Sequence, residues 1–322
     1  MYDSIIIGTG PAGLSAALNL KTYKKDFIWF GSKNLSEKVQ KAEKITNYPG
    51  FPQISGQELF ERFDAHRRAA GIDITEKTVT NIMPAGNGFM VLADNEMYEA
   101  RTLILCMGVM SAKQLDREDE LLGKRLSYCA TCDGMFYKDK TVVVVGGGNS
   151  AAADALLLSR ICKKVILVHR RDELRATKIY HQPLMQAENV EFQWNQTVES
   201  VIESIVADDG HDGRQGRRFS GGRNHVQITG VRLKNAATGE KQEIVCDGIF
   251  VSVGREPETR MIENQVVLDE NGYIIADEST KTNLPGVFAV GDIRTKALRQ
   301  IVTATADGAN AAYAVEEYLA NK

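Results

Sequence analysis

The chain has 322 residues, of which 43% are hydrophobic and 25% charged, and its formal net charge is -3. This length predicts about two domains, and the composition is that of a soluble globular protein. The charge argues against a nucleic-acid or anionic-membrane binder, because both need a basic excess. No apolar run approaches the ~20 residues that span a bilayer, and residues 1–4 have no signal-peptide features.

Five cysteines are too few, and odd in number, for a secreted disulfide framework. We therefore expect a reducing, cytoplasmic location. Cys106, Cys162 and Cys246 lie in or near apolar segments and are interpreted as small buried side chains. Cys129 and Cys132 form the close pair, which can close into a disulfide and open again. The carboxylate that follows them can handle the proton that such chemistry moves.

Residues 3–20 predict a strand, a glycine turn and a helix, with glycines at positions 8, 10 and 13. In such a turn the first glycine permits the bend, the second lets backbone approach a pyrophosphate, and the third lets helix and strand pack closely. The phosphate then lies at the helix N-terminus. The next strand, residues 27–30, ends without the acidic residue that binds an adenosine ribose, so ribose contacts are not assigned.

The middle of the first domain is predicted from spacing. Residues 47–50 form a turn that opens a loop, and residues 57–70 have the apolar spacing of a helix. Residues 78–105 alternate like antiparallel strands, with a hairpin-like turn at residues 86–88.

A second strand, glycine turn and helix begin at Lys140, with Gly146, Gly148 and Ala151 in the G-x-G-x-x-A form. The following strand, residues 165–168, leads into four basic or titratable residues, namely His169, Arg170, Arg171 and, one turn on, Arg175. An acid there would repel a ribose 2′-phosphate, whereas planar guanidinium groups bind it in forked pairs. We interpret this as an NADPH site; the alternative is a solvated basic turn.

Residues 208–224 are rich in glycine and charge and predict a solvated loop between strands at 198–206 and 225–233, with a basic contact patch as the alternative. Further strands are expected at residues 249–255, 273–275 and 287–290. The last of these runs into a glycine and an aspartate that suit close backbone approach and hydrogen bonds to ligand hydroxyls. A final helix is expected over residues 301–319.

Together these features resemble the low-molecular-weight bacterial thioredoxin reductases over nearly the whole chain except residues 208–224. Cys129-Ala-Thr-Cys132-Asp133 matches that family's redox motif letter for letter. The resemblance implies FAD contacts from Gly8, Gly10, Pro11, Ala12, Gly13, Asn47, Gly291, Asp292, Arg299 and Gln300. It implies NADPH contacts from Gly146, Gly148, Asn149, Ser150, Ala151, His169, Arg170, Arg171 and Arg175.

The resemblance also implies an architecture. Two three-layer α/β dinucleotide-binding domains with central parallel sheets are expected. The FAD domain would be discontinuous, over residues 1–112 and 245–322, and the NADPH domain with the dithiol would be inserted at residues 113–244. A homodimer is expected, with rotation of the inserted domain about linkers near residues 112–116 and 243–247.

The implied activity is electron transfer from NADPH to FAD, to the Cys129–Cys132 disulfide and on to a thioredoxin-like protein. By resemblance, Cys132 faces the flavin and Cys129 attacks the substrate disulfide. Asp133 is the candidate general acid–base group; the alternative is a helix N-terminal residue that satisfies backbone amides.

The sequence departs from the family at two places on the FAD side. Ser36-Glu37-Lys38 replaces Gly-Gly-Gln, and Cys106-Met107-Gly108 replaces Ala-Thr-Gly. These changes keep open the alternative that the chain is a reductase that takes electrons from ferredoxin or another flavin carrier. A thiol-independent flavoprotein oxidase would leave the dithiol unexplained. A zinc module needs four ligands, and the sequence offers no second C-x-x-C, so no metal site is expected.

Overall fold

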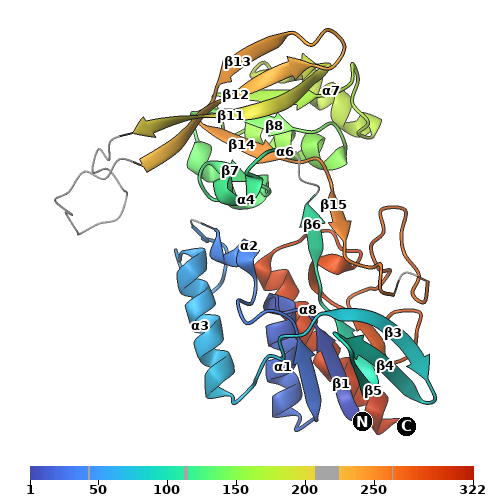
Figure 1. The fold of residues 1–322 in the computed structure, drawn as a ribbon. Coiled ribbons are helices and arrows are strands. Elements are labelled where there is room, and N and C mark those ends of the chain that lie inside the picture. The colour runs from blue at the N-terminus through green and yellow to red at the C-terminus, as the bar shows by residue number, and fades with distance from the viewer. Residues whose placement is uncertain (43, 112–114, 207–224, 263) are drawn as a thin grey trace, which may run out of the picture. The chain divides into compact units, whose positions relative to one another are not determined.

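A computed structural model shows the chain as two units, each with its own sheet and cores (Figure 1). It describes every residue except 43, 112–114, 207–224 and 263. Unit 1 consists of Met1–Ser111 and Arg255–Lys322, and unit 2 of Ala112–Gly254. Unit 2 continues past residue 244, where the sequence placed the boundary, because strand β14 (Gly248–Val251) pairs with its sheet.

The sheet of unit 1 is organised around strand β1 (Tyr2–Ile7). This strand lies between β2 (Phe27–Phe30) and β5 (Glu96–Leu105) and runs parallel to both. The second half of β5 also pairs in parallel with β16 (Val287–Ala289). These four strands form the parallel part of the sheet that the first glycine motif predicted.

The first half of β5 belongs to an antiparallel part of the same sheet. It pairs with β4 (Gly88–Ala93), which pairs in turn with β3 (Val79–Ala85). The predicted alternating strands and the turn between β3 and β4 are therefore confirmed. The sheet of unit 1 is mixed rather than purely parallel.

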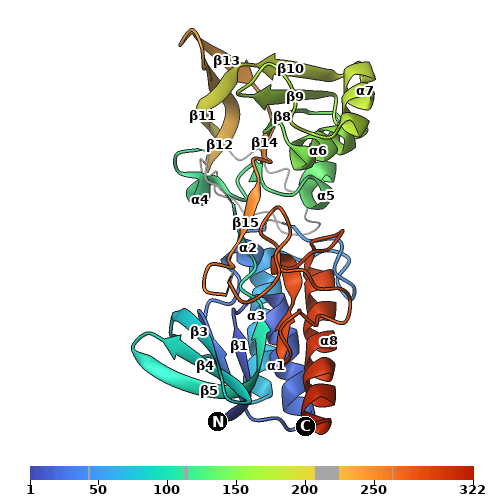
Figure 2. The ribbon, with the colours of Figure 1, turned by 90° about the vertical axis from the view of Figure 1, so that its right-hand side faces the viewer.

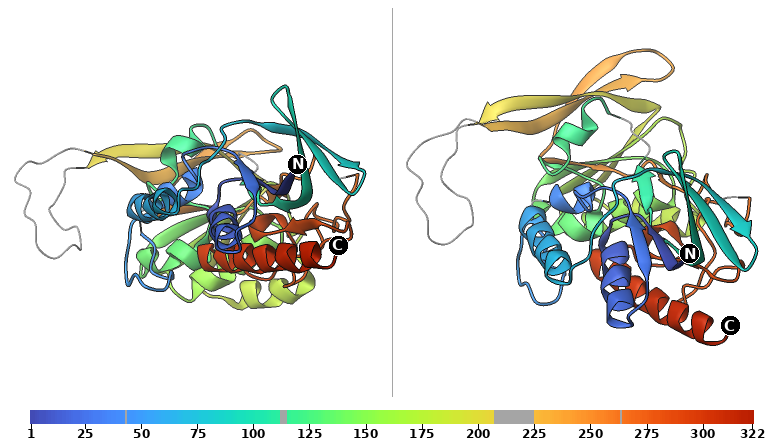
Figure 3. Two further views of the ribbon diagram at one scale, coloured as in Figure 1. Left: turned by 90° about the horizontal axis from the view of Figure 1, so that it is seen from below. Right: turned by 60° about the horizontal axis from the view of Figure 1, so that its bottom comes forward.

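Helices α1 (Pro11–Thr22) and α8 (Ile301–Ala320) pack side by side against this sheet (Figures 2 and 3). Ile6 belongs to the core beneath these helices, whereas Ile5 and Ile7 belong to the core on the opposite face. Successive side chains of a strand point to opposite faces, so one short apolar run supplies both cores.

Helix α3 (Gly56–Ala69) confirms the predicted helix after the turn at residues 47–50. It begins with a capping box, in which the Ser55 hydroxyl accepts the Glu58 N–H and the Glu58 carboxylate accepts the Ser55 N–H. The short helix α2 (Glu37–Gln40) precedes it.

The sheet of unit 2 is parallel throughout. Its order is β10 (Val190–Trp194), β9 (Lys164–His169), β8 (Thr141–Val145), β14 and β7 (Leu126–Ser127). The chain leaves β8 toward β9 on one side, whereas β14 lies on the other. The end of β8 is therefore the switch point at which open parallel sheets bind ligands.

Both faces of this sheet are covered (Figure 2). Val142 and Val144 of β8 pack toward helices α6 (Asn149–Ser159) and α7 (Lys178–Gln186). Val143 and Val145 pack toward a three-stranded antiparallel sheet. Unit 2 thus has the expected three layers. The strands of the antiparallel sheet are β11 (Gln196–Val206), β12 (His225–Asn235) and β13 (Lys241–Val245).

Two predictions about local structure need correction. Residues 273–275 are not a strand: Ile274 makes isolated bridges to Leu268 and Arg294, after a turn in which the Asp269 carboxylate accepts the Tyr273 N–H. The expected strand over residues 249–255 divides, because the chain passes into unit 1 after residue 254. Its last part becomes β15 (Arg255–Pro257), which pairs with β6 (Val109–Ser111).

The predicted loop at residues 208–224 lies outside the described residues. Across the described parts of the chain, no helix combines the length and apolarity needed to cross a bilayer. The remaining short elements are α4 (Glu118–Leu121), α5 (Ala130–Asp133), and the 3-10 turns η1 (Gly134–Tyr137) and η2 (Gly291–Ile293).

The contact between α1 and α8 requires glycine at position 308. A Cβ at Gly308 would lie 2.2 Å from the Ala12 carbonyl oxygen. Helix propensity alone predicts that Gly308→Ala stabilises the protein by about 1 kcal/mol. We expect the steric clash to dominate and to destabilise it by about 1–3 kcal/mol in chemical denaturation.

Ala306→Gly, at an exposed position of the same helix, reports the propensity effect without the clash. A Gly308→Ala protein as stable as the wild type would contradict this close packing.

Candidate functional site

The two cysteines of the C-x-x-C pair are joined in a disulfide at the start of helix α5, just after strand β7. Their Cα atoms are 5.3 Å apart, a separation that one helical turn produces. Cys129 is the N-cap residue, and its Sγ accepts the N–H of Cys132 at 3.2 Å. A hydrogen bond to sulfur of this kind favours the thiolate once the disulfide is reduced.

Asp133 follows the disulfide and is half-buried. Burial raises the pKa of its carboxyl group, although a hydrogen bond from Ser127 acts in the opposite direction. The Ser127 hydroxyl donates to Asp133 Oδ2 at 2.5 Å. Cys129 is the N-cap residue of α5, whereas Asp133 occupies the N-cap position of the following turn η1 without a side-chain cap hydrogen bond. Its carboxylate therefore satisfies no backbone amide of that turn, although the alternative interpretation required it to. A carboxyl group with a raised pKa is suited to donating and accepting protons near neutral pH.

The glycine turn of unit 2 lies between β8 and α6. Gly146 has φ +142°, and a Cβ there would lie 2.4 Å from the Ser252 carbonyl oxygen. A Cβ at Gly148 would meet no described atom within 4 Å. The turn is therefore tight at its first glycine and open at its second, immediately before the N-terminus of α6, as pyrophosphate binding requires.

Neighbouring residues fix this turn. Ala151 is buried beneath Gly146, and Ser150 is exposed at the start of the helix. The side-chain oxygen of Asn149 accepts the Thr177 N–H at 2.7 Å, and this bond connects the turn to the start of helix α7. Asn149 thus has a structural bond that sequence reasoning did not foresee.

His169 is buried against the glycine turn, where a Cβ at Gly147 would lie 2.3 Å from its ring. Burial, together with Arg175, Arg171 and Arg170, lowers the pKa of His169 and so favours the neutral ring. Its Nε2 has no hydrogen-bond partner among the described residues.

The three arginines after β9 gather beside the same turn. The backbone N–H of Arg175 donates to the Gly147 carbonyl oxygen at 2.8 Å, which holds that residue next to the glycines. Arg170, Arg171 and Arg175 are exposed, and no ion pair to another described residue engages them. Three guanidinium groups are thus available to an anion.

The glycine turn of unit 1 repeats this geometry. Gly8 has φ +109°, and a Cβ there would lie 2.4 Å from the Cys106 carbonyl oxygen. A Cβ at Gly13 would lie 2.3 Å from the Gly8 carbonyl oxygen, whereas one at Gly10 would meet no described atom within 4 Å. Pro11 then begins helix α1. These residues fit a second dinucleotide pyrophosphate.

The second FAD motif lies beside the first. Gly291 has φ +72°, and a Cβ there would lie 3.2 Å from Ala12 Cβ. Arg299 donates to the Asp292 carbonyl oxygen at 3.3 Å, and its guanidinium lies 4.0 Å from the centre of the Tyr273 ring. Gln300 is the N-cap residue of α8. The structure thus gathers these residues in unit 1, while Asn47 is exposed in the turn before α3.

Both departures from the family pattern make local contacts here. Ser36 is the N-cap of α2 and accepts the Val39 N–H at 3.4 Å. A small pocket beside Gly10 is lined by Ser36, Leu35 and Phe63, among others. The buried Cys106 thiol lies within hydrogen-bond distance of two acceptors, the carbonyl oxygens of Ile7 at 2.9 Å and Gly8 at 3.0 Å, and burial raises its pKa. Cys106 thus supports the glycine turn.

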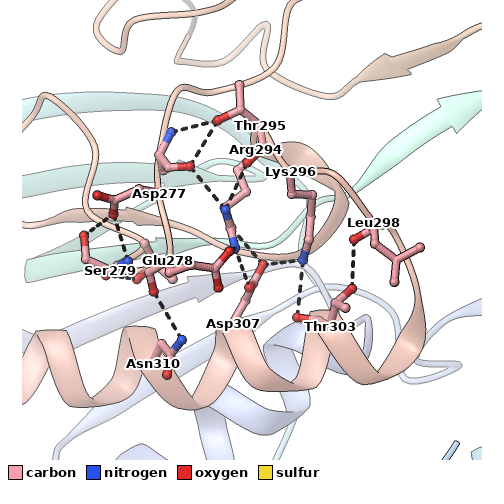
Figure 4. Close-up of polar contacts among 12 residues, drawn as sticks. Asp277, Glu278, Ser279, Arg294, Thr295, Lys296, Leu298, Thr303, Asp307 and Asn310 are labelled. Atoms are coloured by element: carbon pink, nitrogen blue, oxygen red, sulfur yellow. Dashed lines mark hydrogen bonds and ion pairs between the residues drawn. The ribbon is translucent and has the colours of Figure 1, made fainter. Parts of the chain in front are cut away.

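Figure 4 shows a buried ion network of Asp307, Arg294 and Lys296 that sequence reasoning missed. Asp307 also holds the Gly291 turn. Asp307 of α8 accepts the Gly291 N–H at 2.8 Å, two hydrogen bonds from Arg294 at 2.7 and 2.9 Å, and one from Lys296 at 2.8 Å. Burial alone would raise the pKa of Asp307, but these bonds hold it below its usual range. No local motif marks these residues, because their pairing exists only in the folded chain.

The described residues contain no group of three or more His, Cys, Asp or Glu side chains placed to hold a metal ion.

Comparisons with known proteins agree with this arrangement. The sequence profile of the pyridine nucleotide-disulphide oxidoreductase family matches residues 2–308. The chain is 36% identical to a thioredoxin reductase of Listeria monocytogenes, over 99% of this chain and 94% of the relative. The crystal structure of a thioredoxin reductase from Streptococcus pyogenes matches with a TM-score of 0.87 and 34% identity, over 100% of this chain and 99% of that one.

This chain belongs to the thioredoxin reductase family. Membership confirms the predicted fold class of two dinucleotide-binding α/β domains and fits the redox disulfide at Cys129–Cys132. The family also includes a ferredoxin–flavin thioredoxin reductase from Clostridium acetobutylicum. That structure matches with a TM-score of 0.53 and 32% identity, over 99% of this chain and 98% of that one. Family membership alone therefore leaves the electron donor undecided.

The ion network provides a stability test with a matched control. Asp307→Ala leaves Arg294 and Lys296 buried without their carboxylate and should cost about 3–5 kcal/mol. Glu278 pairs with the same arginine at 3.2 Å, but its side chain is 85% exposed against 2% for Asp307. Glu278→Gln should therefore cost less than about 1 kcal/mol.

The difference in stability loss between Asp307→Ala and Glu278→Gln should also depend on pH. Because the pKa of Asp307 is lowered in the folded protein, its contribution is present at neutral pH and is lost as pH falls through that value. Urea unfolding at neutral and acidic pH measures both effects, and equal losses for the two variants would contradict this account.

Proposed function

We propose that this chain is an NADPH-dependent thioredoxin-disulfide reductase. It would move two electrons from NADPH, by way of FAD, to the Cys129–Cys132 disulfide and then to a thioredoxin-like protein. The observation behind the proposal is the disulfide at the start of α5, in the same unit as a glycine turn flanked by three exposed arginines. We also expect a cytoplasmic homodimer, as the resemblance implies.

FAD fits unit 1. Its pyrophosphate would lie at Gly10 and the N-terminus of α1, and the Gly291-Asp292 turn beside Ala12 would bind its ribityl hydroxyls. When bound, FAD would supply the chemistry that accepts a hydride and passes two electrons on to a disulfide. The buried Asp307 holds that turn in place through the Gly291 N–H.

NADPH fits unit 2. Its pyrophosphate would approach Gly148 and the N-terminus of α6. The 2′-phosphate would be bound by Arg170, Arg171 and Arg175, whose exposed guanidinium groups offer paired donors. A site for NADH would place a carboxylate there.

The dithiol chemistry balances in two stages. Two electrons and two protons convert the disulfide to two thiols. The Cys129 thiolate then attacks one sulfur of the partner's disulfide, and the partner's other sulfur leaves as a thiolate. The Cys132 thiolate next attacks the Cys129 sulfur of the mixed disulfide, which re-forms the Cys129–Cys132 disulfide and releases the partner's second thiolate. Asp133, with its raised pKa, would supply and recover the proton. By resemblance, unit 2 rotates between the two stages.

Reduction by ferredoxin or another flavin carrier is the second candidate. The match to the Clostridium acetobutylicum ferredoxin–flavin enzyme and the Ser36-Glu37-Lys38 segment favour it. The exposed arginines beside the glycine turn favour NADPH, because a ferredoxin-fed enzyme has no use for a 2′-phosphate site.

The donor is tested with FAD-loaded protein under anaerobic conditions. We expect NADPH to bleach the flavin absorbance rapidly, NADH to do so far more slowly, and the reduced protein then to reduce a thioredoxin. Bleaching by reduced ferredoxin without bleaching by NADPH would select the second candidate.

The arginines provide a sharper prediction. Arg170→Gln with Arg171→Gln removes charge-assisted hydrogen bonds and should raise the KM for NADPH by about 10–100-fold, with the KM for NADH unchanged. Arg160→Gln, which removes an exposed cation at the other end of α6, should change neither constant. Steady-state kinetics with both nucleotides measure this. An unaltered preference for NADPH in the double variant would show that the arginines do not bind the phosphate.

A further inference from the structure

Ser127 links the acid–base candidate to the dithiol. Its side chain lies at the end of β7 and is 4% exposed. Its hydroxyl donates to Asp133 Oδ2 at 2.5 Å and accepts the Cys129 N–H at 2.9 Å. The Cys129 carbonyl oxygen lies 3.5 Å from the same hydroxyl and offers a second acceptor.

This arrangement serves both protonation states of Asp133. A serine hydroxyl has one hydrogen and two lone pairs. When Asp133 is ionised, the hydrogen points to its Oδ2. When Asp133 is protonated, its own O–H can donate to Ser127, whose hydrogen then turns to the Cys129 carbonyl oxygen. The Cys129 N–H keeps its acceptor in both cases.

We propose that Ser127 is a positioning residue that holds the Asp133 carboxyl group in both of its protonation states and couples it to the backbone of Cys129. The inference rests on the proposed function, because this coupling matters for turnover only if Asp133 exchanges protons with the dithiol.

The surroundings make Ser127 the dominant polar influence on Asp133. No charged side chain contributes to the raised pKa of Asp133; burial raises it and the Ser127 hydrogen bond lowers it. Of the elements next to α5, helix α6 presents Asp154, which accepts a hydrogen bond from Ser252 at 2.6 Å. Lys138, at the end of η1, is exposed.

Removal of the Ser127 hydroxyl should therefore raise the pKa of Asp133 further. We expect Ser127→Ala to move this pKa upward by about one unit, the size expected for one charge-assisted hydrogen bond. The side-chain carbon signal of Asp133 in a pH titration by NMR measures it directly, without turnover. The limb of the pH–rate profile that Asp133→Asn abolishes should move in the same direction.

Two variants serve as controls. Ser127→Thr keeps the hydroxyl and should restore the wild-type titration. Ser159→Ala removes a hydroxyl of unit 2 that donates to the Leu156 carbonyl oxygen at 2.9 Å, and should leave Asp133 unchanged.

Failure of the Ser127 proposal can be distinguished from failure of the proposed function. An unchanged Asp133 titration in folded Ser127→Ala protein would overturn the assignment of Ser127. Full turnover by Asp133→Asn would instead overturn the acid–base role in the proposed function, whatever Ser127 does to the titration.

Discussion

The redox site is organised around one covalent constraint, the disulfide that joins Cys129 and Cys132 across a single helical turn. Its position is fixed by the end of β7 on one side and by the packing of α5 against α6 on the other. Around it the chain supplies a sulfur that accepts a backbone N–H, a carboxyl group with a raised pKa, and a serine that bonds to both. A disulfide in this setting is suited to repeated opening and closure.

Two glycine turns of the same design lie one in each unit. In each, the carbonyl of a facing segment excludes a side chain at the first glycine, while the second glycine faces open space before a helix N-terminus. The turns differ in what holds them. In unit 2, Gly147 packs against His169 and binds the arginine-bearing segment. In unit 1, Cys106 supports Gly8, and the buried Asp307 holds the neighbouring Gly291 turn.

The sequence was sufficient to predict those elements that depend on local patterns of residues. Both glycine motifs, the arginine segment and the strands and helices next to them follow from spacing within a few residues, and the structure has them. The unit boundary at residue 254, the bridge from Ile274 to Arg294 and the partners of Asp307 depend on contacts between segments that are distant in sequence. The partners of Ser127 are only two and six residues away, but no motif marks them. No repeating pattern in a single sequence indicates which of these residues will pair. The roles of the predicted nucleotide-binding residues stay predictions.

The central claim is that electrons from NADPH reach Cys129 and Cys132. It is tested most directly by anaerobic titration of the FAD-loaded protein with NADPH, with alkylation and mass spectrometry to identify free thiols at each point. The account predicts uptake of about two equivalents of NADPH, with alkylation of both cysteines, because flavin and disulfide each accept two electrons. The Cys129→Ser, Cys132→Ser protein should take up about one equivalent. Full flavin bleaching with the wild-type disulfide still intact would contradict it.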